Sequence, residues 1–393
     1  MIGRIFAPSL VVTLVALVVA YLYLGWTGLA LCAILGVLEV SLSFDNAVIN
    51  ATILERMSAF WQRMFLTVGV LIAVFGMRLL FPLVIVWITG NLNPVEALDL
   101  AMNPPPEGQT HFADGQPSYE TILTEAHPQI AAFGGMFLLL LFLNFVLTER
   151  PQTWLTWLER PLATLGKLDQ LAVVIASLAL VLTAEFLAPD EVRATVLIAG
   201  ILGMVTYITV DGLSSLFMAE PDADPATEDD ADSDGDGADG TGADGAGAEQ
   251  ADRGRSGPHP VTVATGKAGF FLFLYLELLD ASFSFDGVIG AFAITSDPII
   301  IALGLGFIGA MFVRSITIYL VRKGTLGEYR YLEHGAHWAI GALAAILLIS
   351  IEFEINEVVT GLVGVAFIGA SLASSIRANR REARAASPDR LAV

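Results

Sequence analysis

The sequence predicts an all-α protein, a polytopic bundle of membrane-spanning helices, and three observations support this fold class. Of the 393 residues, 55% are hydrophobic and only 15% are charged, whereas soluble domains average about 25% charged residues. The apolar residues lie in runs of about 20, the length that a helix needs to cross the hydrocarbon core. A polar motif occurs twice, each time inside such a run. This composition excludes an ordinary soluble domain.

Scanning for such runs gives ten expected spans. The basic residues are an independent indication, because Lys and Arg collect on the cytoplasmic side of a membrane protein. Arg78 and Arg314 lie inside spans, and all other basic residues except Arg193 fall on one side of the ten-span arrangement. This predicts a multi-pass protein of the cell membrane with both termini in the cytoplasm. The spans are residues 8–24, 27–53, 63–89, 130–148, 170–187, 194–217, 266–295, 298–322, 336–352 and 358–376.

Two segments between the spans have an unusual composition. Residues 219–262 hold about a third of the 40 acidic residues, separated by Gly and Ala, which predicts a disordered cytoplasmic linker. Residues 90–129 hold six acids and no Lys or Arg, which predicts an exterior loop, either solvated or folded into a small cap. The expected parts of the chain are residues 1–188 as a first transmembrane repeat, 189–218 as the start of a second, 219–262 as the linker, 263–376 as the rest of the second repeat and 377–393 as a basic cytoplasmic tail.

A ten-residue motif at residues 39–48 returns at residues 280–289. Six of the ten positions are identical or differ only as Glu/Asp or Val/Ile. The following span carries one buried arginine in each case, Arg78 or Arg314. The copies lie in the second and seventh spans, an odd number apart, so the two motif helices run in opposite directions. This is the inverted-repeat arrangement of many transporters, whose site lies near the bilayer midplane.

The polar side chains of each motif form one stripe at helical spacing. Asp45 and Asp286 lie six residues after the first acid of their copies, about 120° away from the stripe. A straight helix could not aim both acids at one ion, so we expect both motif helices to be broken by local unwinding. The stripes are Glu39, Ser43, Asn46 and Asn50 in the first copy and Glu277, Asp280, Ser284 and Gly287 in the second.

An ionised acid at the bilayer centre costs at least about 2.5 to 3.5 kcal/mol, so these acids favour a functional site. The structural alternative is that they pair with Arg78 and Arg314 to hold the bundle together. Carboxylate, amide and hydroxyl oxygens favour Mg²⁺, Mn²⁺ or Ca²⁺ over Zn²⁺ or Cu⁺. Since Cys32 is the only cysteine, the chain has no intrachain disulfide and no thiolate metal cluster.

Other polar residues in or near the spans have two interpretations each. Asn144 is a candidate for lining the transport path, or it makes a hydrogen bond between helices. Asp211 and Glu185 are either entrance acids or interface residues. His334 and His337, three residues apart, are more often an incidental surface pair than metal ligands.

Residues 39–48 resemble the first signature of the TerC family of tellurium-resistance membrane proteins. Residues 279–298, followed by a Gly-rich span that ends in Arg314, are similar to the second signature of that family. The resemblance covers the two motif hairpins, about a third of the chain. It implies a relative of the larger LysE-type exporter group, with members that export manganese and support the metal loading of secreted enzymes.

Carried over by position, the resemblance also implies a set of cation ligands. The sequence departs from the family pattern at Gly287, where a serine is expected, and in its long exterior loop and acidic linker. The implied ligands are Glu39, Asp45, Asn46, Asp280 and Asp286.

We therefore expect export of a divalent cation, with Mn²⁺ favoured and Mg²⁺ or Ca²⁺ as other candidates, and no prosthetic group. One alternative is a metal-binding scaffold that organises a stress-response or secretion complex without transport. Another is an exporter of an organic cation, with a cavity lined by Phe44, Phe283 and Phe285. No protease, hydrolase or P-loop motif occurs, which argues against an enzyme. The expected partners are the lipid bilayer and the cation, with no nucleic acid, in a possible homo-oligomer or membrane complex.

Overall fold

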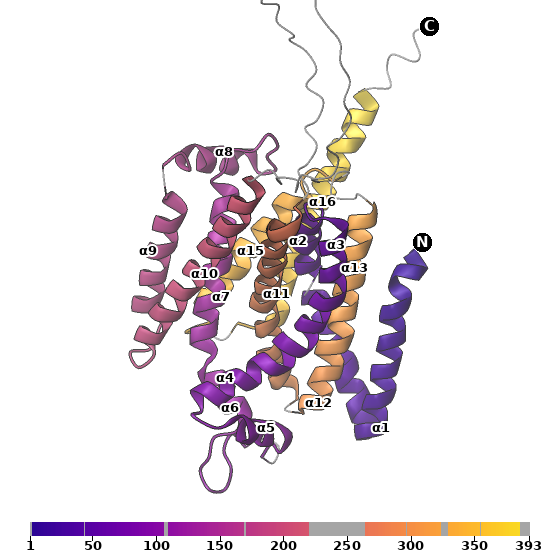
Figure 1. The fold of residues 1–393 in the computed structure, drawn as a ribbon, viewed down its shortest axis with the longest axis vertical. Coiled ribbons are helices and arrows are strands. Elements are labelled where there is room, and N and C mark those ends of the chain that lie inside the picture. Colours follow the sequence, from indigo (N-terminus) through magenta and orange to yellow (C-terminus); the bar gives the residue numbers. More distant parts are fainter. Residues whose placement is uncertain are drawn as a thin grey trace, which may run out of the picture.

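The structure is a computed structural model that describes residues 2–42, 44–105, 109–168, 170–219, 264–295, 297–323, 329–353 and 355–385. Within these ranges some side chains are not described, among them those of residues 41–45 and 283–286. The predicted linker at 219–262 lies outside the described residues apart from residue 219. In the described part the helices form one bundle and no β-strand occurs (Figure 1).

The elements follow one another as α-helices and π-helical segments, the latter labelled η. They are α1 (Ile2–Leu42), α2 (Phe44–Leu54), α3 (Ala59–Met64), η1 (Phe65–Gly69), η2 (Ile72–Leu80), α4 (Phe81–Thr89), α5 (Pro94–Met102), α6 (Tyr119–Glu125), α7 (His127–Val146), α8 (Thr156–Leu165), α9 (Leu171–Phe186), α10 (Arg193–Ala219), α11 (Gly266–Ile294), α12 (Pro298–Ile301), η3 (Ala302–Gly309), α13 (Ala310–Lys323), α15 (Leu332–Ile349) and α16 (Glu357–Ala385).

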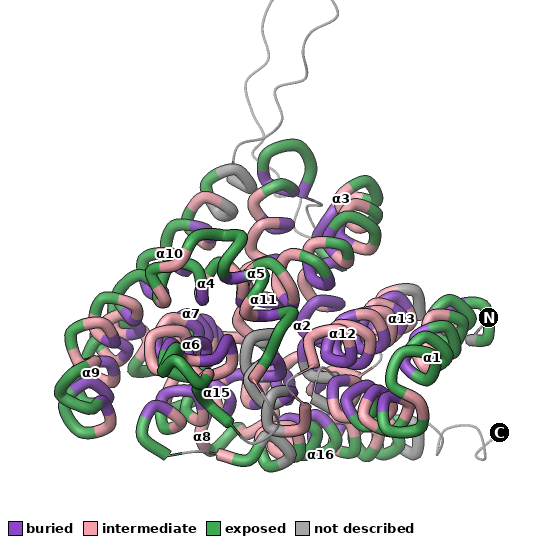
Figure 2. The backbone as a smooth tube through the Cα atoms, turned by 90° about the horizontal axis from the view of Figure 1, so that it is seen from below, coloured by how far each residue is buried: buried purple, intermediate pink, exposed green. Residues whose placement is uncertain are grey.

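Seven helices in the described part of the chain are long and apolar enough to cross a membrane. The helical membrane bundle is therefore confirmed, while the number of ten spans is not. A further apolar helix, α9, has 16 residues. Figure 2 shows buried residues at the centre of the bundle and exposed ones at its rim. Large apolar side chains such as those of Leu22, Trp26 and Phe186 are exposed, as expected for a surface that faces lipid.

Helix α1 reverses direction at Leu24 and Gly25, between the first two expected spans. Gly25 has φ +62°, a left-handed conformation that costs little only for glycine. Gly28 lies directly against the Ala20 carbonyl, although residues eight apart on a straight helix are about 12 Å apart. The reversal lets both legs of α1 cross the bundle, and the second leg packs against η3.

The expected unwinding of the second motif helix is wrong, because α11 is a continuous helix from Gly266 to Ile294. It contains no proline, and in an apolar surrounding a continuous helix satisfies its own backbone hydrogen bonds. In the first copy, α1 ends at Leu42 and α2 begins at Phe44. Ser43, where the break was expected, lies outside the described residues.

The helices that follow the two motifs both contain π-helical segments. Segments η1 and η2 lie in the helix at Ala59–Thr89, and η3 lies in the helix at Pro298–Val321. Such wide turns are rare and occur frequently at functional sites. Arg78 lies within η2, and Arg314 follows η3 by five residues.

The expected exterior loop at residues 90–129 contains two short helices, α5 and α6. Asn93 begins α5 with a capping box, in which its side chain accepts from the Glu96 amide and Glu96 accepts from the Asn93 amide. Ala97 and Ile122 pack with Val86 at the end of α4. These helices form a small cap at the end of the bundle opposite α8 (Figure 1).

Candidate functional site

Six polar residues lie buried where α1, α2, η2 and α11 meet. All six were predicted from the sequence, either as members of the two polar stripes or as a buried arginine. Each is at most 5% exposed, although all six are polar or charged and the surrounding helices are apolar. Burial of this kind needs compensation by partners within the protein or by a bound ion. They are Glu39, Asn46, Asn50, Arg78, Glu277 and Asp280.

Arg78 and Glu39 form a buried ion pair. An Nη of Arg78 lies 2.5 Å from Glu39 Oε1, and the two side chains are 2% and 4% exposed. Arg78 also donates a hydrogen bond to the Ala73 carbonyl at 3.3 Å. The pair connects the second leg of α1 to η2, so the first motif and the span after it are held by opposite charges.

Asn46 connects the two motif helices. Its side-chain amide donates to Asp280 Oδ1 at 2.6 Å, although the residues are 234 positions apart. This contact brings one member of each polar stripe together, as expected for stripes that face each other. The other carboxylate oxygen of Asp280 has no hydrogen-bond partner among the described residues.

Glu277 is buried without compensation from the described part of the chain. It is 5% exposed, and neither of its carboxylate oxygens has a hydrogen-bond partner there. Asp280, one turn along α11, lies near enough to repel it. Gly69 in η1 makes room for the carboxylate, because a Cβ at that position would overlap Glu277 Oε1. Glu277 therefore has spare capacity to accept a proton or a cation.

A small cavity of about 20 Å³ lies beside these residues, enough for one water molecule or ion. Asn50, Arg78, Asp280 and Arg314 all line it. Arg314 is held in place by a hydrogen bond from Nε to the Leu66 carbonyl at 2.7 Å. The two arginines that the sequence singled out therefore reach the same cavity from the two π-containing helices.

Gly287, where the sequence departs from the TerC pattern, lies against the same site. A Cβ added there would be 3.1 Å from Glu39 Oε2. The glycine therefore gives the Glu39 carboxylate room that a larger side chain would fill.

Four other predicted site residues lie where side chains are not described: Ser43 and Asp45 in the first motif, and Ser284 and Asp286 in the second. Their proposed roles as ligands or supporting residues still rest on the sequence alone. Among the side chains that are described, no three His, Cys, Asp or Glu residues lie together as a metal site would need.

Asn144 and Asp211 belong to a second polar cluster, away from Arg78. The Asn144 amide donates to the Tyr207 hydroxyl at 2.9 Å, which is the interhelical hydrogen bond that the sequence left as one alternative. The Tyr207 and Tyr275 rings are neighbours, with a centroid distance of 6.3 Å, and the carboxylate of Asp211 lies near both tyrosines. The sequence analysis missed the tyrosines, although Tyr207 stands four residues before Asp211 on one face of α10.

Glu159 is a further buried acid that the sequence analysis missed. It is 4% exposed, and His334 Nδ1 lies 3.1 Å from its Oε2. His337 stacks on the Phe145 ring with a centroid distance of 3.6 Å. The expected surface position is therefore wrong for His334, which is 5% exposed because it packs against the buried Glu159, while His337 is held by its stacking on Phe145. No spacing in the sequence distinguishes Glu159 from a surface charge of α8.

Comparison with known families gives one match that covers most of the chain. A family model described as a protein of unknown function (DUF475) matches residues 44–382. No curated protein and no solved structure matches the chain. The match includes both π-containing helices and α11, so it covers every element of the buried site except the α1 leg that carries Glu39.

Proposed function

The chain belongs to the DUF475 family of proteins of unknown function, and we propose that it moves a divalent cation across the membrane through the acids around Glu277 and Asp280. The proposal keeps Mn²⁺ as the favoured ion and export as the direction. Both of these details come from the resemblance of the motifs to the TerC family.

The buried, unpartnered carboxylate of Glu277 carries the proposal. An acid buried among apolar helices without a hydrogen-bond donor costs several kcal/mol if it is ionised. Asp280 Oδ2 and Asn50 Oδ1 also lack hydrogen-bond partners among the described residues. A hard divalent cation would give all these oxygens a partner, because carboxylate and amide oxygens are its usual ligands.

The charge around the cavity also favours a cation. Asp280, Arg78 and Arg314 line the cavity. The buried acids Glu39 and Glu277 lie behind this lining, against Arg78 and Gly69. If all are ionised, the balance is negative by one charge. The sequence adds Asp45 and Asp286 to the same helices, which would increase this excess.

Movement of the ion, rather than binding alone, is supported by the arrangement of the helices. The motif repeats on α1/α2 and on α11, each followed by a π-containing helix with an arginine, and internal repeats are common in transporters. In our proposal the two halves expose the site alternately to each side. The end of the bundle with α3 and α8 is cytoplasmic in this scheme, because it carries Arg56, Arg150 and Arg160.

The test is ion flux into proteoliposomes that hold the full purified chain. Mn²⁺, Mg²⁺, Ca²⁺ and Zn²⁺ are offered separately to the wild type and to Glu277→Gln. We expect flux of one hard cation, reduced at least tenfold in the variant, because the amide keeps the size but loses the charge. Glu125→Gln is the matched control, since it removes an exposed carboxylate from the end of α6 and should keep wild-type flux.

Two results would count against the proposal. Equal flux in Glu277→Gln and the wild type would show that the Glu277 carboxylate takes no part in transport. Binding of Mn²⁺ by the wild type without any flux would favour the scaffold instead, in which the same acids hold a metal permanently.

A further inference from the structure

A pocket of about 360 Å³ lies at the end of α7, between the connection that follows this helix and α8. Its lining begins at Phe145 and Val146, the last two residues of a span that runs over His127–Val146. The pocket is thus at the depth where the hydrocarbon core ends and the lipid headgroups begin. Helix α8 lies across the end of the bundle beside it (Figure 1).

The outer side of α8 fits a position at the lipid surface. Trp157 is 76% exposed and Leu165 is 54% exposed, which would be unfavourable in water but suits the interface between water and hydrocarbon. Tryptophan in particular is enriched at that level. An amphipathic helix in this orientation lies in the headgroup layer, with its apolar side chains reaching toward the acyl chains.

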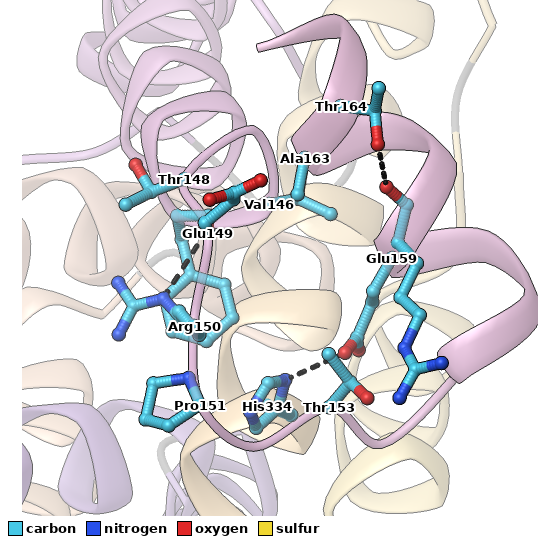
Figure 3. Close-up of a pocket in the computed structure, with 12 residues that line it drawn as sticks. Val146, Thr148, Glu149, Arg150, Pro151, Thr153, Glu159, Ala163, Thr164 and His334 are labelled. Atoms are coloured by element: carbon cyan, nitrogen blue, oxygen red, sulfur yellow. Dashed lines mark hydrogen bonds and ion pairs between the residues drawn. The ribbon is translucent and has the colours of Figure 1, made fainter. Parts of the chain in front are cut away.

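The inner side of α8 is fixed by Glu159. Its carboxylate accepts hydrogen bonds from the Trp154 amide at 2.9 Å and from Trp338 Nε1 at 3.0 Å. His334 lies on the same carboxylate, as Figure 3 shows. The charge of Glu159 is therefore engaged by donors within the protein.

Two arginines give the pocket a positive character. Arg150 lies over the Phe145 ring, with its guanidinium carbon 3.8 Å from the centroid, and is paired with Glu333 at 3.6 Å. Arg160 is exposed on α8. Arg160 has no ion pair with any described residue, whereas the acid Glu149 is paired with Lys167 at 2.9 Å. The lining acids are therefore occupied, and at least one guanidinium remains available to an anion.

We propose that this pocket binds the phosphate group of an anionic phospholipid, with Arg160 as the main donor and the charge of Arg150 beside it. A guanidinium can donate two parallel hydrogen bonds to phosphate oxygens. The lipid source follows from the depth of the pocket and from Val146 and Ala163 in its wall, which suit the glycerol and upper acyl carbons. Basic pockets at the cytoplasmic ends of helices are a general mode of lipid recognition.

The test counts phospholipids bound to the full chain in detergent by native mass spectrometry. Phosphatidylglycerol and phosphatidylcholine are titrated separately into the wild type, Arg160→Gln and Arg63→Gln. Arg63 is the matched control, because it is an exposed arginine on α3, outside the pocket. We expect phosphatidylglycerol to bind more tightly than phosphatidylcholine, and Arg160→Gln to weaken it about fivefold, the effect of one basic residue near the surface.

Three outcomes would overturn the proposal. The first is an equal loss in Arg63→Gln and Arg160→Gln, which would mean general surface attraction. The second is equal binding of phosphatidylcholine, which would mean that the anionic charge is not recognised. The third is displacement of the lipid by inorganic phosphate at the same concentration, which would assign the pocket to the free ion. Since Arg160 is exposed, an unchanged melting temperature in Arg160→Gln distinguishes lost binding from lost folding.

Discussion

Glu39 and Glu277 are glutamates buried to a similar extent in one site, but their surroundings differ. Glu39 has the Arg78 guanidinium at 2.5 Å, whereas neither oxygen of Glu277 has a hydrogen-bond partner in the described part of the chain. A buried ion pair recovers much of the cost of removing its charges from water, and a lone buried carboxylate does not. The site therefore combines a fixed half, which holds the helices, with an open half, which has capacity for a ligand.

The largest effect should come from Arg78→Gln, because it removes the positive charge from the fixed half. Glu39 would be left buried without its counter-charge, which typically costs about 3 to 5 kcal/mol. We expect a strongly lowered melting temperature in detergent. The double variant Arg78→Gln with Glu39→Gln should recover part of this loss, and a double variant as unstable as the single one would contradict the pairing.

The two glutamates should respond to the same substitution with opposite signs. Glu39→Gln leaves Arg78 buried and unpaired, so we expect a loss of about 2 kcal/mol or more. Glu277→Gln removes a charge that has no partner, so metal-free protein should gain about 1 kcal/mol. Circular dichroism of both variants during unfolding, in the absence of divalent cations, measures these changes in the free energy of unfolding. A loss of stability in Glu277→Gln would show that the carboxylate has a stabilising partner.

Gly69 should be less tolerant of a methyl group than Gly306, a glycine of the other π-containing helix. Gly69→Ala places a Cβ against Glu277 Oε1, and overpacking of this kind costs about 1 to 3 kcal/mol. Gly306→Ala is the control, because its nearest neighbour would be Val74 Cγ1 at 3.8 Å. Thermal unfolding should separate the two variants, and cation flux should fall only in Gly69→Ala. Equal behaviour would mean that the Glu277 carboxylate moves aside freely.

The smallest effect should come from the second polar cluster. Asn144→Ala removes one hydrogen bond to Tyr207, worth about 1 kcal/mol or less, and the site at Glu277 keeps all its contacts. Cation flux should therefore remain close to that of the wild type. A large loss of flux would show that Asn144 lines the transport path, which is the other interpretation of this residue from the sequence.

The sequence predicts the framework of the fold well, because helix formation in an apolar run depends on local residues. The turn between residues 24 and 27 is an example, since Gly25 supplies the reversal of α1. The contact between Asn46 and Asp280 also agrees with the sequence, which led us to expect that the polar stripes of the two motif copies face each other.

Properties set by distant residues are harder to predict. The isolation of Glu277 depends on Gly69, about 200 positions away, and Glu159 is buried only because Trp338 and His334 come from another helix. The continuity of α11 was missed for a related reason. The angle between Asp280 and Asp286 suggested a break, but a continuous helix keeps every backbone hydrogen bond of that segment.

The π-helical segments next to the arginines have a consequence for variation in chain length. A turn closed by an i to i+5 hydrogen bond holds one residue more than an α-turn. Such a turn absorbs a single insertion, so the helix on either side of it keeps the same faces toward its neighbours. Homologous chains can therefore differ by one residue within η2 or η3 and still direct α4 and α13 into the bundle. An equal insertion in the regular helix α11 would instead rotate everything after it by about 100°.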